Sequence, residues 1–336
     1  MPMQAPRCLR LIMLALVLFP LGCTANRPGE RPGSGEATAI RFEYARVVMG
    51  SRARIVVYAG DEATAIEASR EAFGEMDRLN LVLSDYTAKS EAMRLCASPA
   101  GVAYPVSADL LDVMLKASIV HEASGGAFDP SLGALTSLWR VSFKSGVLPE
   151  RPVLEDARAR SGLGLIEIDA GQSKILIRRA GVKLDFGAIG KGYAADRALD
   201  VLARHGLNRA MVDLGGDLAL GDSPPAADGW EIAASNDRGD SHPLLLSNVG
   251  VATSGDTYRS VTIDGVRYSH ILDPRTGLGL RSSQAVTVTA EEAWLADALA
   301  SAASVLGPEG CRRLTERWPS ARTIWLAPRA PNRANP

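Results

Sequence analysis

The sequence predicts an α+β fold, in which mainly antiparallel sheets pack against helices. The first observation is a series of short runs rich in β-branched residues, several of which arrive as adjacent pairs. Neighbouring strands of this kind pair as hairpins, whereas a parallel sheet needs a helix between successive strands. The second observation is a set of four longer segments whose apolar residues recur with the helical period. No internal repeat is visible in the chain.

The four helices are expected at residues 62–79, 108–123, 193–204 and 290–305. Ser107 is placed to cap the second helix and Gly125 to end it, while Gly206 ends the third. The strands are expected at residues 54–58, 174–178, 182–186, 210–214, 230–234, 260–263 and 285–289. The runs 174–178 and 182–186 flank a short Ala-Gly turn, so we expect them to form a hairpin.

The two ends of the chain are expected to lie outside the folded domain. Residues 1–22 resemble a bacterial lipoprotein signal: Arg7 and Arg10 precede a short apolar run, and Gly22 comes directly before Cys23, the expected lipidation site. The alternative is an ordinary secretory signal cleaved near Ala25. Residues 23–39 are rich in Gly, Pro and charge and should form a flexible tether. The tail at 327–336 has a similar composition and is expected to be disordered and to add nothing to the core. Residues 40–326 remain as the domain.

Composition excludes some classes of protein. The formal net charge of −1 comes without any basic block, so nothing points to nucleic acid. Cys96 and Cys311 are far apart and lack metal-type spacing. An exported protein permits a disulfide between them, and two buried thiols are an equal alternative.

Asp297 stands in the alanine-rich stretch 290–305, where a carboxylate has no packing role. Ser301 follows one helical turn later, so both oxygens face the same side. A buried carboxylate is costly unless it is paired or bound to a cation, and such oxygen ligands suit Mg²⁺ or Ca²⁺. The alternative is that Asp297 bonds to neighbouring backbone or to an arginine.

A glycine-rich turn at residues 184–194 leads into the third expected helix and carries Asp185 and Lys191. Small residues let the backbone approach a ligand, and a helix N-terminus offers N–H groups to an anion. Lys191 adds a point charge suited to phosphate. The spacing differs from that of a P-loop, and a tight connection with a solvated lysine is the alternative.

Three further clusters combine aromatic and polar groups. After Gly125 come Phe128, which could stack on a flat ring, and Asp129, although a helix stop followed by a turn explains the segment as well. Tyr86 offers an aromatic ring in a segment where Ser90 could simply cap a helix. His270 sits at a strand-to-turn junction crowded with polar groups, where a general base competes with a structural histidine.

Taken in order, these segments resemble the FAD:protein FMN transferase family, also named the ApbE or thiamine-biosynthesis lipoprotein family. The resemblance runs from about Met49 to Gly307. It depends on "MGS" at 49, "LSDYTAKSEAMRL" from 83, "GGAFDPSLGAL" from 125, "LDFGAIGKGYAADRA" from 184, "VDLGGDLALG" from 212, "ATSGDTYR" from 252, "YSHILDPRTG" from 268 and "ADALASA" from 296.

The resemblance implies an ApbE-like (T-fold-like) domain that takes FAD as substrate. It implies transfer of the FMN half to a threonine hydroxyl, with release of AMP and dependence on Mg²⁺. The implied acceptors are membrane redox subunits that carry a short Thr-containing motif. The implied location is the bacterial cell envelope, with a lipid anchor in a membrane facing the periplasm; the inner membrane is favoured.

The resemblance also implies roles for individual positions. His270 matches the base proposed for the acceptor threonine. The positions that match the family's FAD contacts are Met49, Tyr86, Ala127, Phe128, Asp129, Asp185, Lys191 and Leu272. The metal ligands fall on Asp297 and Ser301, with backbone carbonyls of Ala188 and Ala300.

Three departures from the family pattern concern flavin affinity rather than the reaction class. Ser301 replaces a threonine, Leu280 stands where a proline is common, and Cys96 replaces an asparagine. Two other functions stay open from the sequence: a Mg²⁺-dependent hydrolase that splits FAD into FMN and AMP, and a flavin-holding lipoprotein without catalysis.

Overall fold

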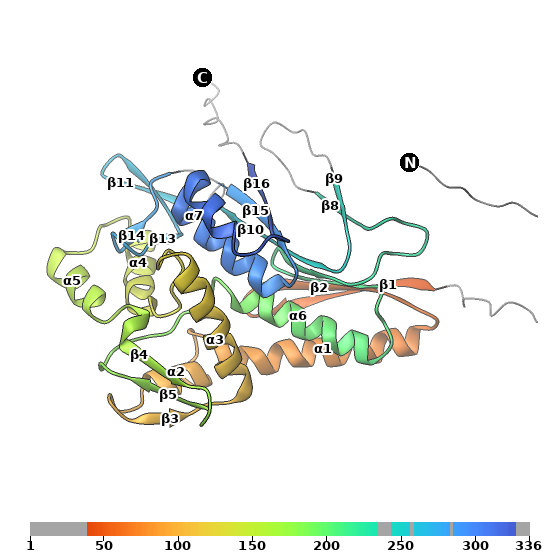
Figure 1. Cartoon of the computed structure of the whole chain (residues 1–336), viewed down its shortest axis with the longest axis horizontal. Coiled ribbons are helices and arrows are strands. Elements are labelled where there is room, and N and C mark those ends of the chain that lie inside the picture. Colours follow the sequence, from red (N-terminus) through yellow and green to blue (C-terminus); the bar gives the residue numbers. More distant parts are fainter. Residues whose placement is uncertain (1–38, 234–242, 256–258, 283–284, 327–336) are drawn as a thin grey trace, which may run out of the picture. The chain divides into compact units, whose positions relative to one another are not determined.

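A seven-stranded antiparallel sheet is the largest element of the structure, a computed structural model that describes residues 39–233, 243–255, 259–282 and 285–326 (Figure 1). All of these residues belong to one unit, Thr38–Pro336. The expected signal peptide, Cys23, almost all of the tether and the tail at 327–336 lie outside the described residues. The strands, in their order across the sheet, are β1 (Ile40–Val48), β2 (Ser51–Ala59), β6 (Ala210–Leu214), β7 (Asp217–Leu220), β10 (Val249–Gly255), β15 (Ala285–Ala290) and β16 (Arg322–Leu326).

The two faces of this sheet bury different cores, because side chains alternate along each strand. On β2, Ile55 and Val57 point into the main core, whereas Val56 between them belongs to a smaller core on the other face. The long helices that pack in the main core are α1 (Glu62–Leu83), α3 (Ala108–Ala123), α6 (Gly190–Arg204) and α7 (Ala293–Thr315). The smaller core includes residues of the hairpin of β8 (Trp230–Ala233) and β9 (Pro243–Leu246).

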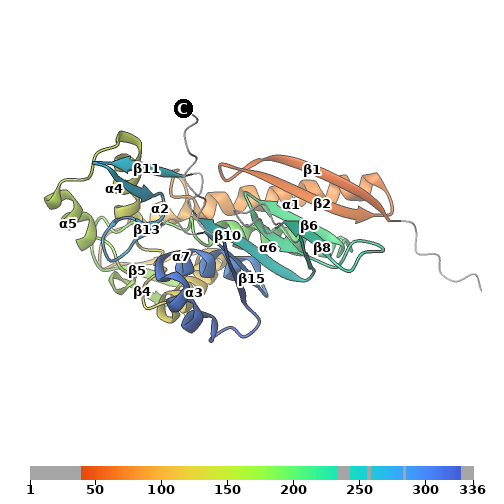
Figure 2. The same ribbon diagram turned by 90° about the horizontal axis from the view of Figure 1, so that it is seen from above.

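Two smaller groups of elements complete the fold. One has its own core around Leu135, Trp139 and Tyr268, and both views place its elements side by side at one end of the unit (Figures 1 and 2). It consists of α4 (Gly133–Ser145), α5 (Arg151–Ala159), β11 (Ser260–Ile263), β12 (Val266–Ser269), β13 (Leu272–Asp273) and β14 (Leu278–Gly279). The other is a three-stranded sheet with a short helix and a 3₁₀ turn: β3 (Ala103–Pro105), β5 (Lys174–Ile177), β4 (Ile166–Asp169), α2 (Glu91–Cys96) and η1 (Leu163–Leu165).

The predicted α+β class with antiparallel pairing is confirmed, since every strand pair of the described residues is antiparallel. The predicted strand at 182–186 is wrong, and so is its hairpin with 174–178. Residues 182–186 do alternate between buried and exposed, but their backbone bonds go to loops and a helix end: Asp185 N donates to Pro130 O at 2.8 Å, and Lys183 O accepts from Gly133 N at 3.0 Å. β5 pairs with β3 and β4 instead.

The starts of α2 and α3 follow their capping serines. Ser107 Oγ accepts from Leu110 N at 3.3 Å, and Ser90 caps α2 through Met93 N at 3.1 Å. The last helix begins at Ala293 rather than at 290, because residue 290 still pairs in β15. The sequence left open a disulfide or two free thiols; Cys96 and Cys311 form no disulfide, so both thiols are free. Within the described ranges, no helix combines the length and the apolar character needed to cross a membrane.

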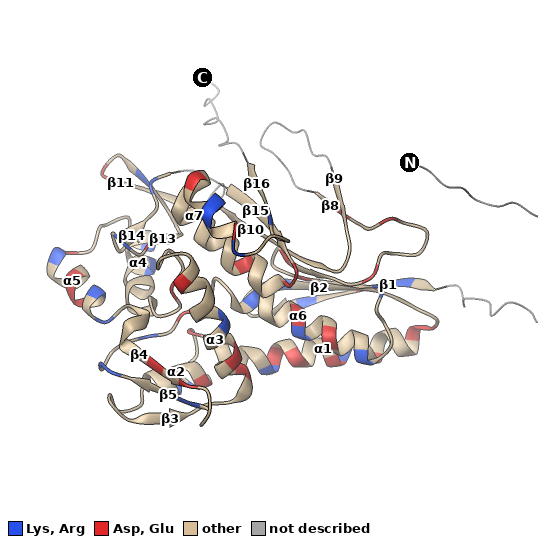
Figure 3. Cartoon of the chain, in the orientation of Figure 1, with Lys and Arg blue, Asp and Glu red and all other residues tan. Residues whose placement is uncertain are grey.

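Acidic and basic side chains both lie along the exposed face of α1 (Figure 3). Glu67 pairs with Arg70 at 2.6 Å and Glu75 with Arg78 at 2.7 Å, each one turn apart. Pairs of this kind stabilise a helix by only a few tenths of a kcal/mol each. The stability of α1 therefore depends mainly on its buried face, which carries Ala68, Ala72 and Met76.

The crossing of α6 and α7 depends on Gly192. A Cβ at this position would lie 2.3 Å from Ala293 O, a backbone atom that cannot move aside without shifting α7. We expect Gly192→Ala to lower the free energy of unfolding by about 1–3 kcal/mol, the usual cost of overpacking, as measured by urea denaturation. Gly74→Ala is the matched control, because Gly74 lies within α1 with open space around it and should gain up to about 1 kcal/mol. An equal change in the free energy of unfolding for the two variants would contradict a close backbone contact between α6 and α7 at Gly192.

Candidate active site

Two buried carboxylates and a half-buried lysine, from three different elements, meet beside the main sheet. Lys191, in the first turn of α6, forms an ion pair with Asp217 at the start of β7. Asp297, on α7 and 5% exposed, accepts a hydrogen bond from Gly192 N at 3.2 Å. Burial raises the pKa of Asp297 to about 8, and the charge of Asp217 adds to this rise. For Lys191 burial acts to lower the pKa, but the carboxylates of Asp297 and Asp217 outweigh it and raise the pKa.

Two tight turns bring the backbone close to this cluster. Met49 and Gly50 form the two-residue turn between β1 and β2, both with positive φ (50° and 69°), which is the geometry that a twisted hairpin favours. Positive φ is unusual for a methionine and costs strain. The β6–β7 turn lies next to it: Gly215 N donates to Arg52 O at 2.9 Å, and a Cβ on Gly215 would come within 2.9 Å of Ser51 and 3.9 Å of the Lys191 side chain. Met49 and Lys191, predicted from distant motifs, therefore belong to one region.

The charges of the cluster fit a bound cation. Lys191 forms its ion pair with Asp217, so the buried Asp297 carboxyl is costly to ionise, and its raised pKa reflects this cost. A bound cation would compensate the ionised form. No set of three or more His, Cys, Asp or Glu side chains in the described ranges is arranged to hold a metal. The remaining ligands would be the hydroxyl of Ser301 and the carbonyls of Ala300 and Ala188, which are oxygen donors of the kind Mg²⁺ takes. The alternative prediction, a hydrogen bond between Asp297 and neighbouring backbone, is also found, because Asp297 accepts from Gly192 N.

The second part of the candidate site is built around Arg140 on α4. Its guanidinium binds both Asp85 and Asp185, the latter at 3.0 Å, and lies 4.6 Å from the ring centre of Tyr86. Tyr86 is 80% exposed, so its ring is open to a flat ligand. Burial raises the pKa of Asp85, the charge of Asp185 adds to the rise, and Arg140 opposes it. Tyr86 and Asp185 were predicted from the sequence, whereas Arg140 was not, because an arginine on a helix carries no local signal of its partners.

Arg140→Ala should therefore destabilise the protein by about 1–3 kcal/mol, because it leaves two neighbouring carboxylates without their shared cation. Without Arg140 the pKa of Asp85 rises further above its unfolded value. The stability that this group contributes is complete below about pH 4 and is lost as the pH rises through the folded pKa. In urea denaturation, the loss in free energy of unfolding relative to wild type should thus be larger at pH 8 than at pH 5. Arg151→Ala, which breaks an exposed ion pair with Glu155 on α5, is the control. If both variants lowered the stability equally and independently of pH, Arg140 would not be bridging Asp85 and Asp185.

The Gly125 segment differs from its prediction in one respect. Phe128 is only 4% exposed and packs in the main core, so the expected stacking of its ring on a ligand is not possible in this structure. The Asp129 carboxylate is used internally: it accepts from Ser131 N at 2.8 Å and from Leu163 N at 3.1 Å. A contact of Phe128 or Asp129 with FAD would thus go through the main chain.

His270 lies between β12 and β13. Its Nδ1 is 3.2 Å from Arg259 O, and because a carbonyl only accepts, this bond places the proton on Nδ1 and the lone pair on Nε2. That tautomer is the one a general base needs. The charge of Arg259 also acts on the pKa of Lys191, which puts the His270 segment within electrostatic range of the buried cluster. Leu272 is buried in the core of the α4–α5 group, so its side chain supports this segment.

Asp217 is a second functional candidate that sequence analysis missed. It is 3% exposed and precedes the apolar residues of β7. The signal that singled out Asp297, a carboxylate in an apolar stretch, would also have found Asp217. Cys96, which replaces the asparagine common in the family, has a structural role. Its Sγ accepts from Leu184 N at 3.2 Å, and burial raises the pKa of the thiol to about 11.

Comparison with known proteins identifies the family. The model of the ApbE family matches residues 49–325. The chain belongs to the ApbE family. A curated relative from Treponema pallidum, named FAD:protein FMN transferase, is 33% identical over 313 residues, which cover 88% of this chain and 86% of the relative. A relative of the same name from Klebsiella pneumoniae is 31% identical over 82% of this chain and 86% of its own length.

Solved structures of ApbE proteins share the fold. The apo flavinyl transferase ApbE of Pseudomonas stutzeri superposes with a TM-score of 0.77 at 30% identity, over 85% of this chain and 91% of the other. The ApbE protein of Thermotoga maritima gives a TM-score of 0.75 at 29% identity, over 85% and 94%. The predicted ApbE-like α+β fold is thus confirmed.

Proposed function

We propose that this chain is a FAD:protein FMN transferase, which moves the FMN half of FAD to a threonine hydroxyl of an acceptor protein, releases AMP and depends on Mg²⁺. The single observation that carries the proposal is the buried cluster of Lys191, Asp217 and Asp297 beside two backbone turns. A cationic group at a helix N-terminus suits a pyrophosphate, and a buried surplus carboxylate suits a divalent cation. Family membership and the names of the relatives support the reaction class.

The remaining site groups would hold the rest of FAD. The exposed ring of Tyr86, fixed by Arg140, offers a stacking surface for flavin or adenine. Lys191 would place its charge near the phosphates, where Asp217 keeps the ammonium oriented and protonated. Asp297, Ser301 and the carbonyls of Ala188 and Ala300 would hold Mg²⁺, which supplies positive charge to the pyrophosphate oxygens and to the leaving phosphate.

The proposed step balances as a displacement at phosphorus. The threonine Oγ forms a bond to the phosphorus of the FMN half, and the bond from that phosphorus to the bridging oxygen breaks. AMP leaves with the bridging oxygen, and the proton of the threonine passes to His270 Nε2. A hydroxyl is a weak nucleophile at its own pKa, so a positioned base is needed. Lys191 stabilises the charge that builds on the phosphate oxygens.

We further propose a place for the enzyme in the cell. Lipidation of Cys23 would anchor the domain, through the tether, to a membrane facing the periplasm, with the inner membrane favoured. The acceptors would be membrane redox subunits with a Thr-containing motif. Labelling with a radioactive fatty acid tests the anchor: wild type should be labelled, and Cys23→Ala should not.

Mass spectrometry of an acceptor tests the reaction itself. The chain is incubated with FAD, Mg²⁺ and a candidate redox subunit, with and without the acceptor threonine replaced by alanine. We expect one FMN added on the threonine and one AMP released for each FMN attached. Rapid AMP release without any acceptor would identify a FAD hydrolase instead. FAD binding without AMP release in the presence of any acceptor would leave a flavin-holding protein.

A further inference from the structure

Helices α6 and α7 cap each other. Neither N-cap residue, Ile189 of α6 or Glu292 of α7, makes a side-chain cap bond of its own. The first N–H groups of a helix have no partner within it and are usually satisfied by a side chain just before the helix. Here the acceptor for each helix comes from the other one.

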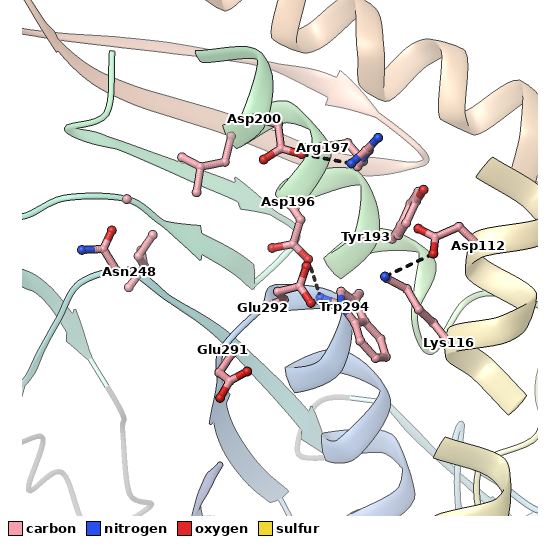
Figure 4. Close-up of a pocket in the computed structure, with 13 residues that line it drawn as sticks. Asp112, Lys116, Tyr193, Asp196, Arg197, Asp200, Asn248, Glu291, Glu292 and Trp294 are labelled. Atoms are coloured by element: carbon pink, nitrogen blue, oxygen red, sulfur yellow. Dashed lines mark hydrogen bonds and ion pairs between the residues drawn. The ribbon is translucent and has the colours of Figure 1, made fainter. Parts of the chain in front are cut away.

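Asp196 supplies the cap of α7. It lies on α6, and its two carboxylate oxygens accept from Ala293 N and Trp294 N, both at 2.8 Å. Figure 4 shows its side chain directed from α6 at the first turn of α7, beside Glu292 and Trp294. Burial raises the pKa of Asp196 to about 7, and the two N–H groups oppose that rise. Because both oxygens accept, the geometry is that of the ionised carboxylate.

Asp297 supplies the reciprocal cap. It lies one turn after Ala293 on α7 and accepts from Gly192 N, in the first turn of α6. Gly192 in turn lies one turn before Asp196 on α6, so the two contacts lie one turn apart on each helix. Between them the backbones touch, since a Cβ at Gly192 would lie 2.3 Å from Ala293 O. Two carboxylates and one close contact therefore fix both the position and the rotation of α7 on α6.

We propose that Asp196 is a positioning residue for the cation site: by capping α7 from α6 it holds the Asp297 carboxylate in place beside Lys191, and its loss weakens binding of a divalent cation. The inference rests on the cation site of the proposed function. It adds that the site depends on a residue that would not touch the cation. Without Asp196, the first turn of α7 loses both acceptors, and Asp297 one turn later is left with a single bond to α6.

Binding of Mn²⁺, followed by the paramagnetic resonance of the free ion, tests this in the whole protein with saturating FAD and no acceptor. We expect Asp196→Ala to raise the Kd for Mn²⁺ by about 10–100-fold, the range found when groups that orient metal ligands are lost. Asp196→Asn keeps one carbonyl acceptor, so its Kd should lie between those of wild type and Asp196→Ala. Asp196→Asn is also needed as a second variant, because Asp196→Ala leaves two buried N–H groups unpaired, which by itself lowers the stability of the fold.

Asp61→Ala is the matched control, since Asp61 caps α1 by accepting from Thr64 N at 2.9 Å, at the end of that helix away from Tyr86. It should lower the melting temperature without changing the Kd for Mn²⁺. An Asp196→Ala Kd within twofold of wild type, or an equal rise in Asp61→Ala, overturns the positioning role. If wild type binds Mn²⁺ no better than Asp297→Asn, the cation site itself fails, and this inference fails with it.

Discussion

Asp297→Asn is expected to lower Mg²⁺-dependent FMN transfer by about 10²–10³-fold, the scale on which loss of one electrostatic stabiliser reduces turnover. Asparagine keeps the volume of the side chain and can still accept from Gly192 N, but it removes the charge that a cation needs. The measurement is the rate of FMN attachment against Mg²⁺ concentration. The variant should show a low rate that added Mg²⁺ does not restore.

The stability of the same variant provides an independent check. Ionising the buried Asp297 is costly without a cation, which its raised pKa reflects, so a neutral replacement should leave the metal-free protein at least as stable as wild type. Asp200→Asn, which removes an exposed charge from α6, should transfer FMN normally. Wild-type turnover in the presence of a chelator, or full activity of Asp297→Asn, would contradict a catalytic cation at this position.

The elements that could be predicted from the sequence are those with a complete local signal. The helix at 108–123 has a capping serine, an apolar period and a glycine stop, and α3 has these bounds. The strand at 210–214 is buried along most of its length, and β6 has these bounds too. Strand β1 was not predicted, although Ile40, Phe42 and Tyr44 alternate with Arg41 and Glu43 as in a half-buried edge strand.

The wrong strand at 182–186 shows what pattern alone cannot decide. Its alternation of apolar and polar residues is real, and Val182 and Leu184 are buried as a strand would bury them. Alternation of apolar and polar residues indicates that one side of the segment is buried. A strand also needs a neighbouring strand that forms backbone hydrogen bonds with it. Here Asp185 N donates to Pro130 O and Lys183 O accepts from Gly133 N, and no local feature of the segment specifies these partners.

The candidate site was predictable where one residue contradicts its surroundings. Asp297 stands out in an alanine-rich helix, and Asp217 carries the same signal beside β7. Arg140 and Asp196 do not stand out, because charged residues are ordinary on helices. Their importance comes from what the fold places opposite them: two carboxylates for Arg140 and the bare end of α7 for Asp196.

His270→Ala is expected to lower the rate of FMN transfer by about 10²–10⁴-fold, the usual contribution of a general base, without changing the affinity for FAD. The ring of His270 is bonded to Arg259 O, whereas the groups proposed to hold flavin and phosphate are Tyr86 and Lys191 on other elements. Single-turnover transfer to an acceptor measures the rate, and quenching of FAD fluorescence measures the affinity.

The two readouts together separate a base from a structural histidine. A structural role would lower both quantities, because a displaced β12–β13 segment would also disturb Leu272 and the core beneath it. His205→Ala is the control, since His205 pairs with Glu71 through Nε2 at 2.9 Å on α6 and α1, and transfer should be normal. Transfer by His270→Ala within twofold of wild type would move the base to another group. A slow rate with intact FAD binding supports His270 as the group that takes the proton of the threonine.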